Sequence, residues 1–211
     1  MPTRTRPKTR RRAPVQKSPL PLFLSLVAVG GLLVLLAIRF GLTGSAKTPP
    51  AMPDWVTADL LEENAYSRPG IPLKQVKGIV VHYVGNPGTT AEQNRSYFAS
   101  LAQTHETHAS AHFVIGLEGE ILQCVPLDEM AYCSNDRNGD TISIECCHPG
   151  EDGAFTQETY DALVKLCRFL IRHYRLHKGD VIRHYDVTGK LCPLYYVEHQ
   201  EAWDRFLTDI F

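Results

Sequence analysis

Residues 78–85, "GIVVHYVG", form a short run of apolar and β-branched side chains between two glycines. Such a run is typical of a buried strand. The next residues, "NPGTT", break the strand, and residues 90–103 then place polar and apolar side chains at helical spacing. We therefore expect a buried strand followed by a helix.

Similar patterns continue downstream. Residues 112–125 are two apolar runs joined by Glu118 and Gly119, which indicates a hairpin. Residues 141–147, "TISIECC", alternate as a strand does. Thr156 is suited to cap the following helix, which carries a single apolar stripe.

The last part of the chain adds one more strand and one more helix. Gly179 ends the long helix, a strand begins at Val181, and residues 198–210 have the pattern of a closing helix. Because strands and helices interleave, we expect an α/β fold with a mixed central β-sheet flanked by helices. This domain is expected to cover residues 54–211.

The charges divide the chain into two parts. Residues 1–53 hold nine Lys or Arg residues and no Asp or Glu, which leaves 13 basic and 23 acidic residues in the remainder. An acidic domain repels a phosphate backbone. Nucleic acid is therefore not an expected partner.

The N-terminal part has the pattern of a membrane anchor. Residues 20–38 contain no charge, and as a helix they would be about 28 Å long, close to the roughly 30 Å of a bilayer core. Seven basic residues precede them, which favours a cytoplasmic N-terminus. We predict a basic cytoplasmic tail at residues 1–19, a transmembrane helix at 20–40 and a linker rich in Gly and Pro at 41–53.

Two other interpretations of this segment stay open. It could be a cleaved signal peptide, with small residues at 44–46 as the cleavage site, or a buried core helix. The anchor places the domain outside the cell membrane, and the signal peptide would secrete it.

In an exported chain the six cysteines raise the question of disulfides. One bridge, Cys124 to Cys133, is conceivable, but burial as small apolar side chains is the better expectation.

Two histidines stand where the pattern predicts burial. His82 interrupts the apolar run, and His184 lies at the end of the strand that begins at Val181. A buried imidazole needs partners for both nitrogens. Together with Cys192 these histidines form a set of three ligands of the types that catalytic zinc prefers. The spacing of these residues does not by itself establish a zinc site. The alternative is that both histidines are buried in the core and form ordinary hydrogen bonds.

Four segments together resemble the zinc-dependent N-acetylmuramoyl-L-alanine amidases, a family related to bacteriophage lysozyme-type amidases and peptidoglycan recognition proteins. The segments are "GIVVHYVGNPGTT", "SAHFVIGLEGEILQCVPLDEMAYCS", "TISIECCHPGEDGAFTQETYDALVKL" and "VIRHYDVTGKLCP". The resemblance covers residues 65–197 and is greatest to the branch found in Gram-positive bacteria and their phages. It implies the fold that the strand and helix pattern predicts.

The resemblance also implies residue roles. The metal ligands fall on His82, His184 and Cys192, and the catalytic carboxylate falls on Glu145. The family's zinc lowers the pKa of a water, and Glu145 would take the proton from that water and deliver it to the leaving amine. Lys190, two positions before the last ligand, would stabilise the oxyanion.

Some of these assignments have ordinary alternatives. If the resemblance is set aside, Glu145 would be interpreted as an exposed carboxylate on a strand. Lys190 would be interpreted as an ordinary lysine in a loop. His112 is expected either to contact the substrate or to pack in the core. Arg68 is expected either to meet carboxylates of the peptide or to lie exposed in a loop. Where some family members carry a tyrosine before "HF", this chain has Ala111, which removes one possible transition-state donor.

The implied function is a Zn²⁺-dependent hydrolase of the cell wall. Its substrate would be peptidoglycan, cut at the amide between N-acetylmuramic acid and L-alanine. A non-catalytic peptidoglycan-binding module on the same fold is a rival, disfavoured because a binder has no need of the Cys192 thiolate. A peptidase that cuts a neighbouring bond is another. A redox protein using Cys146 and Cys147 is disfavoured, since adjacent cysteines lack Cys-x-x-Cys spacing.

Overall fold

The computed structural model describes residues 48–211. The predicted basic tail and transmembrane helix, at 1–19 and 20–40, lie outside the described residues. Within the described range, every helix is too short or too polar to cross a membrane.

The described chain forms one sheet with helices around it. The strands are β1 (Thr57–Ala58), β2 (Gly78–Tyr83), β3 (Phe113–Ile115), β4 (Ile121–Gln123), β5 (Thr141–Cys146) and β6 (Val181–Arg183). They lie in the order β1-β4-β3-β5-β2-β6, and only β3 and β4 pair antiparallel. The mixed sheet predicted from the sequence is confirmed.

Parallel pairing at the centre of the sheet sets the position of the site. β2 pairs with β5 on one side and with β6 on the other, both in parallel. The carboxyl ends of these three strands therefore meet at one edge of the sheet, which is where α/β sheets bind ligands.

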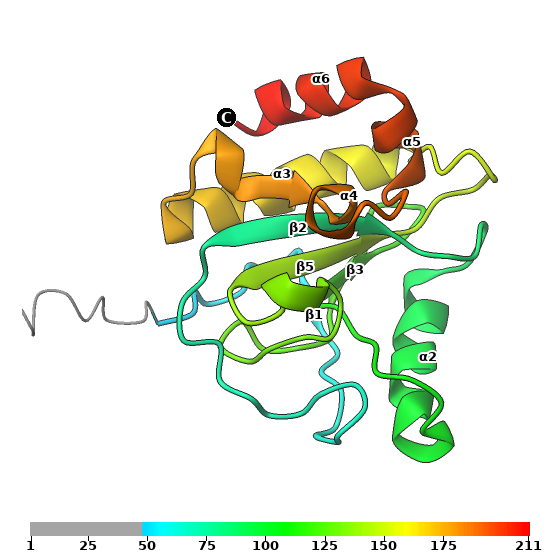
Figure 1. The fold of residues 1–211 in the computed structure, drawn as a ribbon, viewed down its shortest axis with the longest axis vertical. Helices are drawn as coiled ribbons and strands as arrows, with labels where there is room; N and C mark the ends of the chain where they lie inside the picture. The colour runs from blue at the N-terminus through cyan, green and yellow to red at the C-terminus, as the bar shows by residue number, and fades with distance from the viewer. Residues whose placement is uncertain (1–47) are drawn as a thin grey trace, which may run out of the picture. The chain divides into compact units, whose positions relative to one another are not determined.

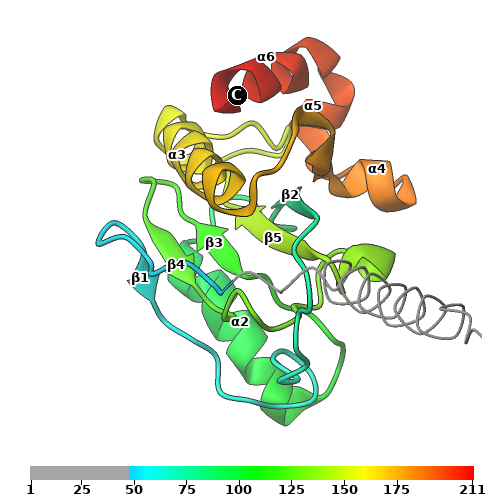
Figure 2. The same cartoon turned by 90° about the vertical axis from the view of Figure 1, so that its left-hand side faces the viewer.

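Helices cover both faces of the sheet. They are α2 (Ala91–Thr104), α3 (Gln157–Tyr174), α4 (His184–Thr188), α5 (Leu194–Glu198) and α6 (Gln200–Ile210), with short 3₁₀ turns η1 (Asn135–Arg137) and η2 (Lys178–Asp180). Figures 1 and 2 show α3 against one face, with α6 packed on α3, and α2 on the opposite face.

The helix starts follow from local side-chain chemistry. The Thr90 hydroxyl accepts from the amide of Gln93, and the Gln93 side chain accepts from the amide of Thr90, which forms a capping box for α2. Thr156 caps α3 by accepting from the amide of Thr159, as the sequence predicted. Gly119 adopts a φ of 83° in the β3–β4 turn, a conformation that favours glycine.

Alternation along the strands sorts side chains between two cores. Ile79 and Val81 of β2 pack with the side chains of α3 and α6, whereas Val84 belongs to a second cluster against α2. Side chains of a strand point alternately to opposite faces. His82 therefore lies on the α2 face, as does Glu145, which is flanked by Ile144 and Cys146 of the α3 core.

Three further details extend the sequence predictions. The two-residue edge strand β1 had no signal in the sequence. Residues 48–53, the described end of the predicted linker, have no regular structure, but Met52 packs on the core. All six cysteines are free, so the bridge considered between Cys124 and Cys133 is wrong, and most of these thiols are buried as expected.

Candidate active site

The carboxyl edge of the sheet brings three metal-ligand side chains together. His82 is in β2, His184 begins α4 directly after β6, and Cys192 lies in the loop after α4. The two Nδ1 atoms are 3.2 Å apart, and Cys192 Sγ is 3.8 Å from His82 Nδ1. All three side chains are buried, and one ligand atom of each lies within 4.8 Å of the others.

The remaining nitrogens of the two rings are held by the η1 loop. His184 Nε2 lies 2.8 Å from Asn135 Oδ1, and His82 Nε2 lies 3.1 Å from Ser134 Oγ. Because an amide oxygen only accepts, His184 must carry its hydrogen on Nε2. A neutral His184 therefore has its lone pair on Nδ1, toward His82 and Cys192. Such outer partners are typical of metal-binding histidines.

The donor set fits zinc. Tetrahedral zinc with bonds of about 2.1 Å to nitrogen and about 2.3 Å to sulfur requires N–N and N–S separations of roughly 3.4 and 3.6 Å. The observed 3.2 and 3.8 Å need little adjustment. Burial lowers the pKa of both histidines, and Lys190 lowers both further, as His184 does for His82, so the rings are neutral as ligands must be.

Cys192 is protonated in the protein without metal. Burial raises the pKa of its thiol to about 12, although Lys190 acts in the opposite direction. A coordinating thiol is deprotonated by the bound cation. Loading of this site with metal therefore releases a proton.

Glu145 stands beside the three ligands with one free oxygen. Its Oε1 accepts from the Cys133 thiol at 3.5 Å, and its Oε2 is buried and has no hydrogen-bond partner. Burial raises the pKa of this carboxyl to about 7, against the opposing effects of Cys133 and Lys190. A carboxyl that titrates near neutral pH can both accept and donate a proton.

These groups line a cavity of about 210 Å³, which we call the active-site pocket. Lys190 is exposed on its wall and close enough to lower the pKa of Glu145. The pocket is lined by His82, Phe98, His108, Ala109, Ser110, Tyr132, Cys133, Glu145, His184, Lys190 and Cys192.

Two residues singled out in the sequence do not line this pocket. His112 is buried in the core, where its nitrogens lie 3.0 Å from Ser143 Oγ and 2.9 Å from the carbonyl oxygen of Glu129. Arg68 forms two hydrogen bonds with the carboxylate of Glu129 and one with the carbonyl of Leu61. The hydrogen-bonding groups of both side chains are thus used within the domain, where they connect loops to one another and to the sheet.

Sequence reasoning missed Cys133, Ser134 and Asn135. They come from an irregular loop with no periodic pattern, so nothing predicted that they would face the ligands. The residue type at position 135 was the one local signal in the sequence. Asn tolerates the left-handed backbone region better than most residues, and Asn135 has a φ of 50°. Sequence reasoning also missed His108, which lines the pocket and contacts Tyr132 edge-to-face.

Comparison with known proteins identifies the family. The family model for N-acetylmuramoyl-L-alanine amidases matches residues 72–194, more than half of the chain. The chain belongs to this family. The resemblance recognised in the four sequence segments is thereby confirmed.

Relatives of this amidase family match the same domain. The chain is 34% identical over 164 residues to N-acetylmuramoyl-L-alanine amidase CwlL of Bacillus licheniformis, a match covering 72% of this chain and 45% of that protein. It is 31% identical over 175 residues to N-acetylmuramoyl-L-alanine amidase BlyA of Bacillus subtilis, covering 71% and 45%. The matches thus span less than half the length of these curated amidases.

A solved structure shares the fold. A mutant endolysin from Bacillus subtilis superposes with a TM-score of 0.60 at 26% identity, covering 74% of this chain and 98% of that one. The mixed sheet and its flanking helices are therefore those of an amidase domain.

Proposed function

We propose that this protein hydrolyses the amide bond between N-acetylmuramic acid and L-alanine in peptidoglycan. The observation that carries the proposal is the free Oε2 of Glu145, buried next to three side chains that match zinc in type and spacing. Membership of the amidase family and relatives named for this activity support it.

His82, His184 and Cys192, which all line the active-site pocket, would hold the metal. Zn²⁺ bound there supplies a Lewis acid that polarises the substrate carbonyl and makes a water more acidic. Ser134 and Asn135 keep both rings oriented toward the ion.

Glu145 moves the proton. Its Oε2 has no competing partner, so it accepts a proton from the attacking water and then delivers that proton to the nitrogen of the leaving L-alanine. The Cys133 thiol donates to Oε1, which leaves Oε2 as the oxygen without a partner. Lys190, which also lines the pocket, stabilises negative charge as it develops on the amide oxygen.

Digestion of purified peptidoglycan by the zinc-loaded full chain tests this function. Mass spectrometry of the products should find stem peptides with a free amine on L-alanine and glycan strands with an intact lactyl carboxylate. Cleavage within the stem peptide would instead identify a peptidase. Binding to peptidoglycan without any product would identify a non-catalytic module.

The proposed cellular location is the outer side of the cell membrane, with residues 20–40 as a single-pass anchor. It is supported by the uncharged residues 20–38 and the seven basic residues before them. N-terminal sequencing of the protein from a membrane fraction should give the intact N-terminus. A new N-terminus near residues 44–46 would show a cleaved signal and a secreted enzyme.

A further inference from the structure

A second set of metal-ligand side chains overlaps the first. His82, Cys133 and Glu145 each offer one ligand atom, and these atoms lie within 4.8 Å of one another. Cys133 comes from the loop before η1, whereas His82 and Glu145 are paired residues on adjacent strands. The catalytic ligand set does not use the Cys133 sulfur. The active-site pocket therefore holds one thiol more than the catalytic ion needs.

Cys133 and Glu145 are spaced as two ligands of one cation. The Cys133 Sγ atom lies 3.5 Å from Glu145 Oε1. Tetrahedral zinc with bonds of about 2.3 Å to sulfur and about 2.1 Å to oxygen requires an S–O separation of roughly 3.6 Å. In the metal-free protein the thiol proton joins the two atoms. Replacement of that proton by a metal ion needs little movement of either side chain.

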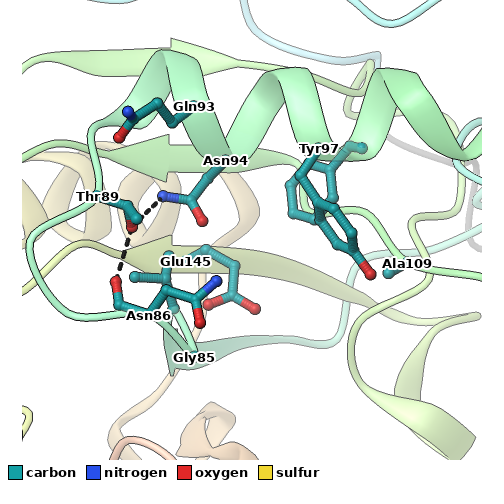
Figure 3. A pocket seen from close by; sticks show the side chains of 10 residues that line it. Gly85, Asn86, Thr89, Gln93, Asn94, Tyr97, Ala109 and Glu145 are labelled. Atoms are coloured by element: carbon teal, nitrogen blue, oxygen red, sulfur yellow. Dashed lines mark hydrogen bonds between the residues drawn. The ribbon is translucent and has the colours of Figure 1, made fainter.

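The second oxygen of Glu145 is also available to a cation. Oε2 is buried, and none of the described residues forms a hydrogen bond with it. Figure 3 shows the side chain beneath α2, where Asn94 bonds Thr89 and Thr89 bonds the backbone of Asn86, with no bond to the carboxylate. A buried oxygen without a partner is costly. A cation bound to the carboxylate would relieve that cost.

His82 belongs to both ligand sets, so the two cations would be neighbours. Its Nδ1 lies 3.2 Å from His184 Nδ1 and 3.8 Å from Cys192 Sγ, so this nitrogen faces the catalytic ion. A second ion would then be held by Cys133 and Glu145 alone, beside the first. Two-metal sites place ions about 3.5–4 Å apart with an oxygen between them, a spacing on the scale of this cluster.

The charges around the second position favour weak binding. The thiolate of Cys133 and the carboxylate of Glu145 together neutralise a divalent ion. Lys190 opposes it, because this cation lines the same pocket and is close enough to lower the pKa of Glu145. Two protein ligands also hold zinc less tightly than three. Zinc should therefore fill the catalytic site first and the second position only in excess.

We propose that Cys133 and Glu145 form a second, inhibitory site for a thiophilic divalent cation, either zinc in excess or cadmium. The cation replaces the thiol proton, which passes to solvent, and forms one bond to the sulfur and one to the carboxylate. A carboxylate bound to a cation cannot accept the proton of the attacking water, so turnover stops. The inhibition rests on the proposed amidase function, whereas the metal site itself does not.

Hydrolysis of a soluble muramyl peptide at rising free zinc tests the inhibition. The zinc-loaded full chain is used in detergent, and each protein is compared with its own rate before zinc is added. Wild type should lose most of its rate, and Cys133→Ala should need roughly 10-fold more zinc for the same loss. Cys133→Ser keeps a hydrogen-bond donor without a thiolate, so it should also resist zinc. Cys124→Ala, at a buried thiol in the apolar cluster on which Cys133 packs, is the control and should be inhibited as wild type is.

Cadmium binding to the zinc-loaded chain measures the site without turnover. Thiolate-to-cadmium absorption should be stronger in wild type than in Cys133→Ala. Any exchange of cadmium for zinc at Cys192 contributes equally to both proteins, so the difference belongs to Cys133. Equal absorption in the two proteins would overturn the site, and equal inhibition by zinc would overturn its effect on the reaction. If wild type hydrolyses no amide, the proposed function fails, and the absorption still decides whether the second site exists.

Discussion

His82 and Glu145 are directly paired residues on the adjacent parallel strands β2 and β5. The pairing runs without interruption from Gly78 and Thr141 to Tyr83 and Cys146, so both side chains point to the same face. The separation of metal-ligand and carboxylate is thus set by the spacing of strands, about 4.8 Å. Regular structure, more rigid than a loop, holds these two groups.

Glu145→Gln should retain zinc and lose turnover by roughly 10²- to 10⁴-fold, because the amide keeps the shape of the side chain and cannot accept the proton. Zinc content and peptidoglycan digestion measure the two properties on the same preparation. Glu62→Gln, at an exposed position, is the matched control and should behave as wild type. Full activity of Glu145→Gln would rule out Glu145 as the base.

Cys192→Ser should lower zinc affinity strongly, since a neutral hydroxyl replaces a thiolate in the ligand set. Elemental analysis after dialysis against a weak chelator measures the retained metal. Cys167→Ala removes another buried thiol, located in the α3 core, and should retain zinc. Equal zinc retention in both variants would show that Cys192 is not a ligand.

Asn135→Gly should weaken zinc binding by roughly 10- to 100-fold, because His184 loses the acceptor that fixes its ring. Glycine is the informative replacement, since it accepts the φ of 50° without strain. Competition with a chromophoric chelator measures the affinity. An unchanged affinity would mean that the fold alone orients His184.

The sequence predicted what has a periodic or chemical signature. Residues 78–85 have the β-branched run of a buried strand, and β2 forms there. Thr156 was expected to cap the long helix, and it is the N-cap of α3. The His82 ligand was visible because a histidine is unusual in such a run. His184 was expected at a strand end, and it begins the short helix α4 there.

Features without such a signature could not be predicted. Ser134 and Asn135 reach the histidines only because η1 folds over the strand ends, a tertiary arrangement that leaves no pattern in the chain. His148 is buried, with its two ring nitrogens within hydrogen-bonding distance of the carbonyl oxygens of Val84 and Gly150, and nothing in the sequence around it predicted burial.

The contribution of Glu145 to the stability of the metal-free protein should fall as pH rises from about 5 to 8. Glu145 has a pKa of about 7 in the folded state, raised by burial from 4.5, so the folded state binds more protons than the unfolded state in this window. The loss attributable to Glu145 should be roughly 3 kcal/mol. Urea unfolding at both pH values measures it.

The Glu145→Gln variant serves as the reference for that experiment. It has no titrating group at position 145 and keeps the buried histidines, so the difference from wild type between pH 5 and pH 8 isolates the contribution of Glu145. Identical pH dependence in the two proteins would place this carboxyl in contact with water, contrary to its burial.

X-ray absorption at the zinc edge of the purified full chain tests the central claim most directly. The account predicts one zinc per chain with a single sulfur at about 2.3 Å, two imidazole nitrogens at about 2.1 Å and one further light ligand. Cys192→Ser should remove the sulfur scattering. A zinc environment without sulfur, or a chain that binds no zinc, would contradict the convergence of His82, His184 and Cys192 on one ion.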